Sequence, residues 1–363
     1  MEPICVSPNN IPHDYSNSVE VYESAMREDV NEEDEALNML NTFDKNRDGV
    51  LDFEEFSNLL QHIFQLGPID MTSEEKLKSF MLLLDLNNDG VIDRTEFQHA
   101  WTHCFDKILH PVTALIIVDV QNDFIDGSLA LRHCPAQQDG AEVVPVINRL
   151  LEEREFDLVV YSMDWHPDTH ISFIDNVHMY PLDKGCTKRF DECCTYDEVT
   201  FDLSPPRTQV LWPAHCIQDS EGAKLASNLK VSPGAVRIYK GTNPDIDSYS
   251  AFFDNMRLSQ TSLQEELEKR HVTDVYICGL AYDVCVAATG VDAVGLGYRT
   301  VIVNDACRGV MEDKIKEEKE KLQEQGALVL ESDEAMKLLA NKARPNFDLG
   351  CFTAKTMPPF AST

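Results

Sequence analysis

Basic residues are scarce in this sequence: its 363 residues include 31 lysines and arginines against 63 aspartates and glutamates, a formal net charge of -32 at pH 7. Nucleic acids and anionic membrane surfaces attract proteins with excess positive charge, so this composition argues against both as partners. Long apolar runs are also missing. Because no stretch of about 18 apolar residues runs uninterrupted, we expect no membrane-spanning helix. Small neutral substrates and cations remain as ligand classes.

A secretory signal peptide has an apolar segment behind a basic start. The N-terminal 30 residues lack this pattern. The 11 cysteines are odd in number, follow no repeated spacing and form no Cys-x-x-Cys pair. This distribution is typical of reduced thiols and argues against a zinc ribbon or a disulfide scaffold. For the adjacent Cys193 and Cys194 we favour two loop thiols over a redox pair. We expect a cytoplasmic protein, with the nucleus as an additional location.

Charge is unevenly distributed along the chain. The part up to His110 holds 23 acidic and 7 basic side chains, a net charge of -16, so half of the charge lies in under a third of the chain. This boundary coincides with Pro111, which precedes the first long β-type run. The sequence predicts a flexible N-terminus over residues 1–30, a first domain over residues 31–110 and a larger domain over residues 111–363.

Two segments of the first domain repeat 41 residues apart: DKNRDGVLDFEE from Asp44 to Glu55, and DLNNDGVIDRTE from Asp85 to Glu96. Each has oxygen-bearing side chains at positions 1, 3, 5, 9 and 12 and a glycine at position 6. This is the calcium loop of an EF-hand, because Ca²⁺ takes several oxygen ligands and the glycine permits the sharp turn. The predicted ligands are Asp44, Asn46, Asp48, Asp52 and Glu55 with the Val50 carbonyl, and Asp85, Asn87, Asp89, Asp93 and Glu96 with the Val91 carbonyl.

Apolar periodicity on both sides of each loop predicts four helices: EALNMLNTF and FEEFSNLLQHIF around the first loop, EEKLKSFMLLL and RTEFQHAWTHCF around the second. The sequence therefore predicts an all-α EF-hand pair that binds calcium. Two alternatives are acidic turns that match by chance and a motif that has lost its calcium affinity. Whether the pair senses calcium, buffers it or stiffens the protein is left open.

From Ala114 onward, short β-branched runs alternate with helical segments. The runs are ALIIVDV, LVVYSMDW, AVRIYKG, DVYICGL, TVIVNDA and ALVL; the helices include AEVVPVINRLLEERE, SLQEELEKRH, DVCVAATGVDAVGL and EDKIKEEKEKLQEQ. Continuous apolar strands between helices indicate an α/β fold with a parallel sheet covered on both faces. Sites in such folds lie outside the carboxyl ends of the strands.

Polar side chains stand at four of these strand ends. Asp119 ends the first run, Asp164 and His166 the second and Lys240 the third, and Cys285 follows the fourth at the start of a predicted helix. Each signal alone has an ordinary explanation, such as a helix-capping aspartate, a solvated lysine or a buried structural thiol. Because they share one edge of a doubly wound sheet, we expect them to converge on one site.

Five motifs, DVQNDF, DWHPDTHISF, WPAHC, YKG and GLAYDVCV, resemble those of the isochorismatase-like cysteine hydrolases, and among these the nicotinamidases. The likeness runs from Ala114 to roughly Ala340, and the whole chain is similar to animal nicotinamidases that carry an EF-hand extension. The resemblance implies a three-layer α/β/α domain with a six-stranded parallel sheet. It also implies hydrolysis of nicotinamide to nicotinate and ammonia in NAD salvage.

The family's catalytic cysteine, lysine and aspartate match Cys285, Lys240 and Asp119. A free thiol has a pKa of about 8.5, but a helix N-terminus, a nearby cation and a neighbouring base favour the thiolate, and we expect Cys285 to have all three. In the implied reaction Cys285 attacks the amide carbon, and Asp119 transfers the proton to the ammonia and later activates water. The N–H groups of Ala281 and Cys285 match the family's oxyanion hole, with a cis peptide bond expected between Leu280 and Ala281.

Asp164 and His166 lie two residues apart, so in an extended segment their side chains point to the same side. His215, in WPAHC, is a third candidate ligand. One carboxylate and two imidazoles suit zinc or a related divalent transition metal. The resemblance implies that this ion holds the pyridine nitrogen of the substrate. His170 is a candidate fourth ligand, the alternative being a loop hydrogen bond.

Trp212 and Phe124 match aromatic residues that line the family's nicotinamide pocket, and Gln121 and Tyr249 are further candidates. A flat pyridine ring requires such walls. For any single aromatic residue, core packing is the ordinary alternative. The segment over residues 175–211 carries no family motif and is interpreted as a lid or an insertion.

Two other functions compete with nicotinamide hydrolysis. A related cysteine amidase acting on a carbamoyl or ureido substrate would share the triad, although the metal set argues against it; isochorismatase chemistry needs neither the thiol nor the metal. A calcium-binding adaptor with an inactive hydrolase domain would lack a catalytic residue, and none is missing. The oligomeric state is left open.

Overall fold

The computed structural model describes residues 32–66, 71–340 and 346–359. The predicted flexible segment over residues 1–30 lies outside them. The described residues form two compact units: the first extends to Thr102, and the second begins at His103 and also includes residues 63–65. Each unit has its own architecture.

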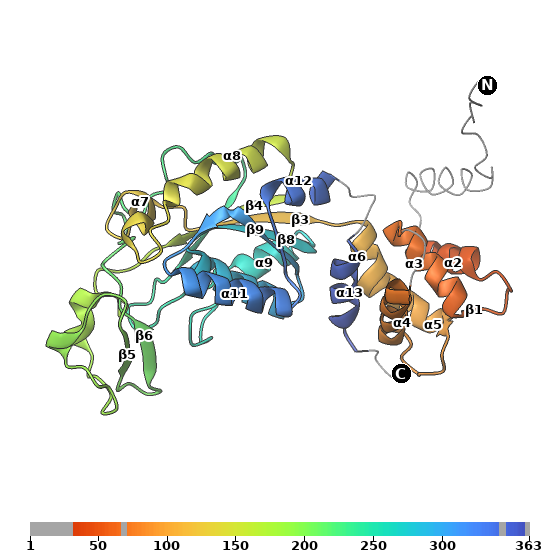
Figure 1. Ribbon diagram of the computed structural model, residues 1–363, viewed down its shortest axis with the longest axis horizontal. Coiled ribbons are helices and arrows are strands. Elements are labelled where there is room, and N and C mark those ends of the chain that lie inside the picture. Colours follow the sequence, from red (N-terminus) through yellow and green to blue (C-terminus); the bar gives the residue numbers. More distant parts are fainter. Residues whose placement is uncertain (1–31, 67–70, 341–345, 360–363) are drawn as a thin grey trace, which may run out of the picture. The chain divides into compact units, whose positions relative to one another are not determined.

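The first unit is a pair of helix-loop-helix motifs, coloured red to orange in Figure 1. Its elements are α2 (Glu32–Phe43), β1 (Val50–Leu51), α3 (Phe53–Phe64), α4 (Met71–Leu84), β2 (Ile92–Asp93) and α5 (Arg94–Ala100). Strands β1 and β2 pair antiparallel and so join the two predicted loops. Both loop glycines, Gly49 and Gly90, have the positive φ that the sharp turn requires (92° and 89°). The four predicted helices are present.

The second unit contains the predicted six-stranded sheet. Its strands are β3 (Thr113–Val118), β4 (Leu158–Asp164), β7 (Val236–Lys240), β8 (Asp274–Leu280), β9 (Arg299–Arg308) and β10 (Leu328–Leu330). All neighbours are parallel, in the order β10-β9-β8-β3-β4-β7. The central β3 and β8 are buried along their whole length, which explains their continuous apolar sequences.

Helices cover both faces of this sheet, which makes the unit a three-layer α/β/α domain as expected (Figure 1). Figure 1 shows α8 and α12 on one face and α9 and α11 on the other. The chain direction explains this: β3 to β4 runs opposite to β7 to β8 and β8 to β9, so right-handed connections place α8 opposite α9 and α10. The longer helices are α8 (Val143–Glu153), α9 (Leu263–Glu268), α10 (Ala287–Gly295), α11 (Glu312–Glu324), α12 (Ser332–Ala340) and α13 (Phe347–Lys355).

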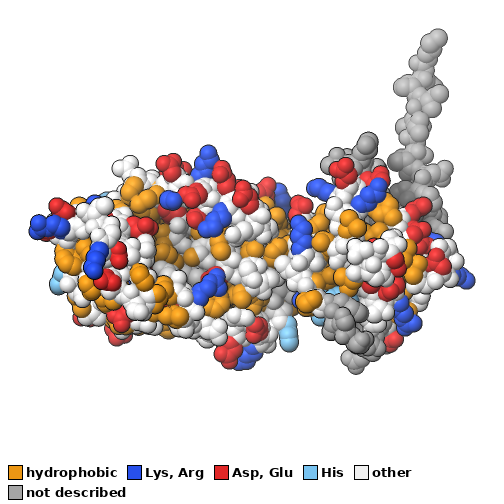
Figure 2. Space-filling view, turned by 90° about the horizontal axis from the view of Figure 1, so that it is seen from below, with side chains coloured by type: hydrophobic (Ala, Val, Ile, Leu, Met, Phe, Trp, Pro, Cys, Tyr) orange, Lys and Arg blue, Asp and Glu red, His pale blue; other side chains and the backbone are white. Residues whose placement is uncertain are grey.

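Short helical turns complete the connections. They are a π-helical turn (Trp101–Phe105), α6 (Asp106–Leu109), α7 (Asn122–Ile125), 3₁₀ turns at Leu131–His133 and Gly140–Glu142, and a π-helical turn that precedes α10 (Tyr282–Val286, labelled η6). None of the helices in the described part of the chain combines the length and apolar character needed to span a bilayer. On the face shown in Figure 2, basic side chains stand scattered among acidic ones.

The segment over residues 175–211, interpreted above as a lid or an insertion, is folded. It contains 3₁₀ turns at Ile174–Met179 and Phe190–Glu192 and an antiparallel hairpin of β5 (Glu198–Phe201) and β6 (Arg207–Val210). The segment contributes Val177, Val199 and Phe201 to a small buried apolar cluster. Trp212 and His215 follow β6 directly in the chain, so this segment positions two of the predicted site residues.

Candidate active site

The carboxyl ends of β3, β4, β7 and β8 bring the predicted polar residues together. Asp119 follows β3, Asp164 ends β4, Lys240 ends β7 and Cys285 lies in η6 after β8. Their side chains are buried, Cys285 being the most accessible at 6%. Strand β3 lies between β4 and β8, so the sheet topology creates the crevice in which these side chains meet.

Lys240 contacts all of the predicted catalytic groups. Its Nζ lies 2.9 Å from Asp119 Oδ2, 3.2 Å from Cys285 Sγ and 2.5 Å from Asp164 Oδ1. The other oxygen of Asp119 accepts a hydrogen bond of 2.6 Å from the Ser162 hydroxyl. Asp119 has a left-handed φ of 48°, so the chain turns sharply at the end of β3. The geometry places an acid, a cation and a thiol in direct reach of one another.

Burial is the largest single influence on the pKa values of Cys285, Asp119 and Lys240. It raises the pKa of the Cys285 thiol well above its ordinary value, although Lys240 acts to lower it. Burial likewise raises the pKa of Asp119 despite the neighbouring Lys240. Burial would lower the pKa of Lys240, but Asp119 and Asp164 reverse this effect and raise it. Lys240 therefore acts on the thiol in the expected direction, while burial, which the sequence does not show, acts in the opposite direction.

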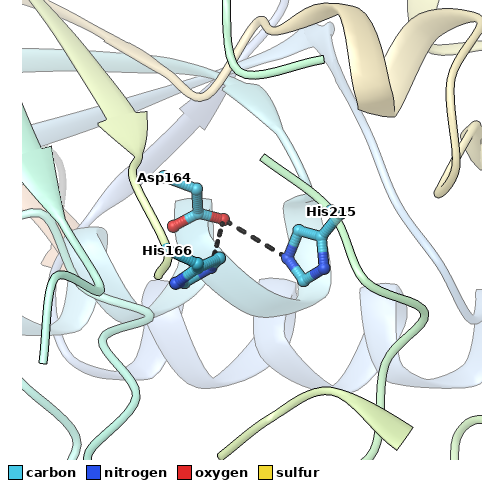
Figure 3. Close-up of side chains that lie close together, drawn as sticks. All are labelled: Asp164, His166 and His215. Atoms are coloured by element: carbon cyan, nitrogen blue, oxygen red, sulfur yellow. Dashed lines mark ion pairs between the residues drawn. The ribbon is translucent and has the colours of Figure 1, made fainter. Parts of the chain in front are cut away.

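Asp164, His166 and His215 form a second cluster beside the first (Figure 3). Asp164 Oδ2 lies 3.6 Å from His166 Nε2 and 3.7 Å from His215 Nε2, and the three side chains point toward one another. Backbone pairing aligns the two histidines, since the His166 N–H donates to the Cys216 carbonyl. The Cys216 N–H in turn donates to the Asp123 carboxylate.

The tautomers of both histidines follow from their outer hydrogen bonds. His166 Nδ1 lies 2.9 Å from the Gly241 carbonyl and His215 Nδ1 lies 2.8 Å from the Pro213 carbonyl. A carbonyl oxygen can only accept, so each Nδ1 carries the proton. In the neutral ring each Nε2 is then unprotonated and faces Asp164 Oδ2, which is the arrangement of metal-binding histidines. The donor set fits a zinc-type divalent ion.

His170 lies against this cluster, with its ring centroid 4.1 Å from that of His166. Its Nδ1 faces Ser172, and its Nε2 lies 3.9 Å from Asp247 Oδ1. Burial lowers the pKa of His170 to about 3. Asp247 is 4% exposed and was missed by sequence reasoning, because it lies outside the matched motifs.

Cys285 and the Asp164, His166 and His215 cluster line one pocket. Phe124, Trp212 and Tyr249 form part of its wall, as predicted, and Ala281 and Cys285 line it as well. The other lining residues are Leu129, Leu131, Asp164, His166, His215, Asp247, Val284 and Val310. The apolar members of this set were not predicted, since ordinary core residues have the same sequence signal.

Gln121 was predicted to line the pocket, but it is not among the residues that line it. Its Nε2 donates to the Asp164 and Ala223 carbonyls, both at 2.8 Å, and its Oε1 accepts from the Asp164 N–H at 2.9 Å. The side chain is fully buried. Gln121 thus fixes the backbone of Asp164, and only the fold could reveal this pairing.

The loop that carries Cys285 has the expected local geometry. The peptide bond between Leu280 and Ala281 is cis, as predicted. Ala281 is the N-cap of η6, whose first turn contains Cys285. The Asp283 carboxylate accepts the N–H groups of Val310 and Met311, each at 2.8 Å, and so fastens this turn to the chain that leaves β9.

The two predicted calcium loops share one internal pattern. In the first loop, Asp44 accepts the Gly49 N–H at 2.9 Å and Glu55 accepts the Lys45 N–H at 2.8 Å. In the second, Asp85 accepts the Gly90 N–H at 3.0 Å and Glu96 the Leu86 N–H at 2.8 Å. The carboxylates at positions 1 and 12 therefore face into each loop. The repeat seen in the sequence is a repeat in structure.

Comparison with known proteins identifies the family. The isochorismatase domain model matches residues 113–334, and an EF-hand domain pair matches residues 33–102. The chain is 39% identical over 202 residues to a nicotinamidase of Escherichia coli (strain K12), covering 55% of this chain and 84% of the relative. It is 34% identical over 216 residues to a nicotinamidase of Saccharomyces cerevisiae, covering 56% and 94%.

Solved structures agree with these matches. A nicotinamidase/pyrazinamidase of Acinetobacter baumanii superposes with a TM-score of 0.53 at 34% identity, covering 62% of this chain and 99% of the other. The yeast nicotinamidase bound to the inhibitor nicotinaldehyde gives a TM-score of 0.51 at 30% identity, covering 60% and 99%. The chain therefore belongs to the isochorismatase domain family and carries an EF-hand domain pair ahead of that domain.

Proposed function

We propose that this protein is a nicotinamidase, an amide hydrolase that converts nicotinamide to nicotinate and ammonia in NAD salvage. The observation that carries the proposal is the contact of Lys240 with both Asp119 and Cys285 at a pocket walled by aromatic side chains. Relatives at 34–39% identity that are nicotinamidases support the substrate. The carbamoyl-amidase and inactive-adaptor alternatives are not favoured, since the relatives are nicotinamidases and the triad is complete.

Cys285 acts as the nucleophile. Its thiol proton passes to Asp119 as the sulfur attacks the amide carbon. The N–H groups of Ala281 and Cys285 stabilise the oxyanion. Asp119 then protonates the departing ammonia, which leaves a thioester on Cys285. Asp119 removes a proton from water, the hydroxide attacks the thioester, and nicotinate is released as the Cys285 thiolate regains the proton from Asp119.

Asp164, His166 and His215 hold a divalent metal of the zinc type in this proposal. The charge balance supports it: three buried carboxylates, Asp119, Asp164 and Asp247, gather at the site with one buried cation, Lys240, which contacts the first two, so these four groups carry a net charge of -2 when all are ionised. Buried charge of this kind requires compensation, which a divalent cation supplies. When bound, the ion supplies a Lewis acid that accepts the pyridine nitrogen and orients the ring.

The remaining assignments follow the same reasoning. The two EF-hand loops bind calcium through the oxygens predicted for them. The enzyme acts in the cytoplasm, where a free thiol such as Cys285 stays reduced.

The nucleophile is tested by Cys285→Ala, assayed as ammonia release from nicotinamide by purified protein. We expect a loss of about a thousandfold or more, because no other group can form the thioester. Cys278→Ala is the matched control: Cys278 is fully buried in β8, and its replacement should keep turnover within about threefold. Near-normal turnover by Cys285→Ala would exclude the thioester mechanism.

The metal is tested by elemental analysis of protein whose calcium has been stripped with a calcium-selective chelator. We expect about one transition-metal ion per chain, because two imidazoles bind zinc-type ions far more tightly than all-oxygen loops do. Removing that ion should abolish activity, and zinc should restore it. Full activity of protein that contains no transition metal would refute this assignment.

A further inference from the structure

His170 differs from His166 and His215 in its tautomer. The Ser172 N–H donates to His170 Nδ1 at 3.4 Å, and the Ser172 hydroxyl lies 2.7 Å from the same nitrogen. A backbone N–H can only donate, so Nδ1 accepts and the ring proton resides on Nε2. An Nε2 that carries a proton has no lone pair for a metal ion. The hydrogen bonds of His170 thus oppose its role as a ligand.

Asp247 is the carboxylate beside the Nε2 of His170, beyond hydrogen-bond distance. Among the described residues this nitrogen has no hydrogen-bond partner, yet it is buried and lies 3.9 Å from Asp247 Oδ1. Asp247 is itself held from two sides: Oδ1 accepts the Ser248 N–H at 2.8 Å and Oδ2 accepts Gln209 Nε2 at 2.9 Å. Gln209 belongs to β6, so the folded insertion supplies one end of a Gln209-Asp247-His170 chain.

The row formed by Gln209, Asp247 and His170 lies beside the metal cluster and does not compete with it for the ion. The metal-binding atoms of His166, His170 and Asp247 lie within 4.8 Å of one another. His166 has only one free nitrogen, which already faces Asp164, so the two overlapping clusters cannot hold two ions. Both oxygens of Asp247 already accept N–H donors, whereas Asp164 Oδ2 faces two imidazole lone pairs. Asp164 is therefore the ligand, and Asp247 lies outside it.

We propose that Asp247 is a positioning residue of the metal centre: its carboxylate lies beside the buried Nε2 of His170, which packs against His166, and its negative charge strengthens divalent-cation binding from outside the ligand set. The proposal rests on the metal centre proposed above. It also assigns a role to the insertion, whose Gln209 holds Asp247 in place. Outer partners of metal-binding histidines typically affect metal affinity by about 10- to 100-fold.

The test uses full-length protein with excess calcium, which occupies the EF-hand loops. Metal-free protein is titrated with Co²⁺ and with Zn²⁺ against a chromophoric chelator, which yields the Kd, and the visible Co²⁺ spectrum reports the ligand set. We expect Asp247→Asn to weaken binding by about 10- to 100-fold with one ion per chain and an unchanged spectrum. Gln209→Ala should act in the same direction but less strongly, because Asp247 remains.

Three further variants separate the roles. His170→Ala should also keep the wild-type spectrum and stoichiometry, whereas His215→Ala, which removes a ligand, should change the spectrum or abolish binding. Asp245→Asn is the control, because this exposed carboxylate accepts a hydrogen bond from the Tyr180 hydroxyl. The Kd of this variant should match that of the wild type. Circular dichroism and Tm verify that each variant is folded.

The outcomes are decisive. A changed spectrum or lost ion in His170→Ala or Asp247→Asn would make that residue a ligand and overturn the proposal. An unchanged Kd in both Asp247→Asn and Gln209→Ala would do the same, as would a wild-type protein that binds no Co²⁺. Nicotinamide hydrolysis by the wild type is measured in parallel, so failure of the metal proposal and failure of the proposed function are distinguished.

Discussion

At the scale of single residues, the site is governed by one buried cation. Lys240 is 2% exposed and lies in contact with Asp119, Asp164 and Cys285, and the two carboxylates raise its pKa so that it stays charged. The charge states of its three partners are therefore coupled through Lys240. Small changes in hydrogen bonding to one carboxylate should therefore be visible in the chemistry of the thiol.

Ser162 provides such a change. Burial raises the pKa of Asp119, and the Ser162 hydroxyl acts with Lys240 to lower it. Asp119 must be ionised to accept the thiol proton, so activity falls as the pH drops through its pKa. Ser162→Ala removes a hydrogen bond to the ionised form, which raises the pKa, and the acid limb of kcat/KM should move to higher pH by about one unit.

The measurement is the pH profile of kcat/KM for nicotinamide with wild-type protein and Ser162→Ala. The alkaline limb serves as an internal reference, because Ser162 contacts only Asp119 among the proposed catalytic groups. An acid limb that stays in place, or moves to lower pH, would show that Asp119 is not the group whose ionisation limits the reaction.

At the scale of elements, the site depends on how closely β8 approaches β3. Gly279, next to the end of β8, has a φ of 118°. A Cβ at this position would lie 2.1 Å from the carbonyl oxygen of Val118, the last residue of β3. Asp119 and Cys285 follow these two strand ends, so a side chain at position 279 would separate the strands at the point where the proposed acid and nucleophile meet.

Gly279→Ala should therefore be costly. Strained φ and a backbone clash together should destabilise the α/β unit by on the order of 3 kcal/mol. The expected fall in its Tm is roughly 6 to 12 °C for a unit of this size. Gly295→Ala is the matched control, because Gly295 is exposed near the end of α10 with nothing within 4 Å of the added Cβ. Equal Tm values for the two variants would contradict the close-approach argument.

At the scale of the whole molecule, the two kinds of proposed metal site lie in two compact units. The loops of the first unit offer oxygens only, whereas the cluster in the second offers two imidazoles and one carboxylate. All-oxygen loops prefer calcium and imidazole sites prefer zinc-type ions, so the two ions should not exchange places. Every residue proposed for catalysis also lies after His110. Calcium should act on the first unit and take no part in amide hydrolysis.

The double variant Glu55→Gln with Glu96→Gln tests this separation. Each substitution removes the bidentate ligand of a loop, so calcium binding should weaken at least about tenfold while nicotinamide hydrolysis stays within about threefold of the wild type. Activity is measured with calcium removed and zinc retained, and calcium affinity by titration. A loss of activity of about a hundredfold in a folded protein would show that the first unit controls the active site.

The sequence by itself determined whatever depends on contiguous residues or on the ends of elements. The calcium loops are complete within 12 residues each, the six strands follow from apolar runs bounded by turns, and Asp119, Asp164, Lys240 and Cys285 could be placed because parallel strands all end at one edge. Asp164 and His166 were recognisable as a pair because extended chain alternates its side chains.

Only the tertiary structure decided what depends on contacts between distant segments. Gln121, predicted to line the pocket, instead binds the backbone of Asp164, 43 residues away. Asp247 enters the site through Gln209 and His170, and no local pattern marks any such pairing. Lys240 favours the thiolate of Cys285 as expected, whereas the burial that raises the pKa of this thiol exists only in the folded chain. Side-chain partners, tautomers and desolvation are properties of the packed chain, because each depends on which distant atoms exclude water from a group.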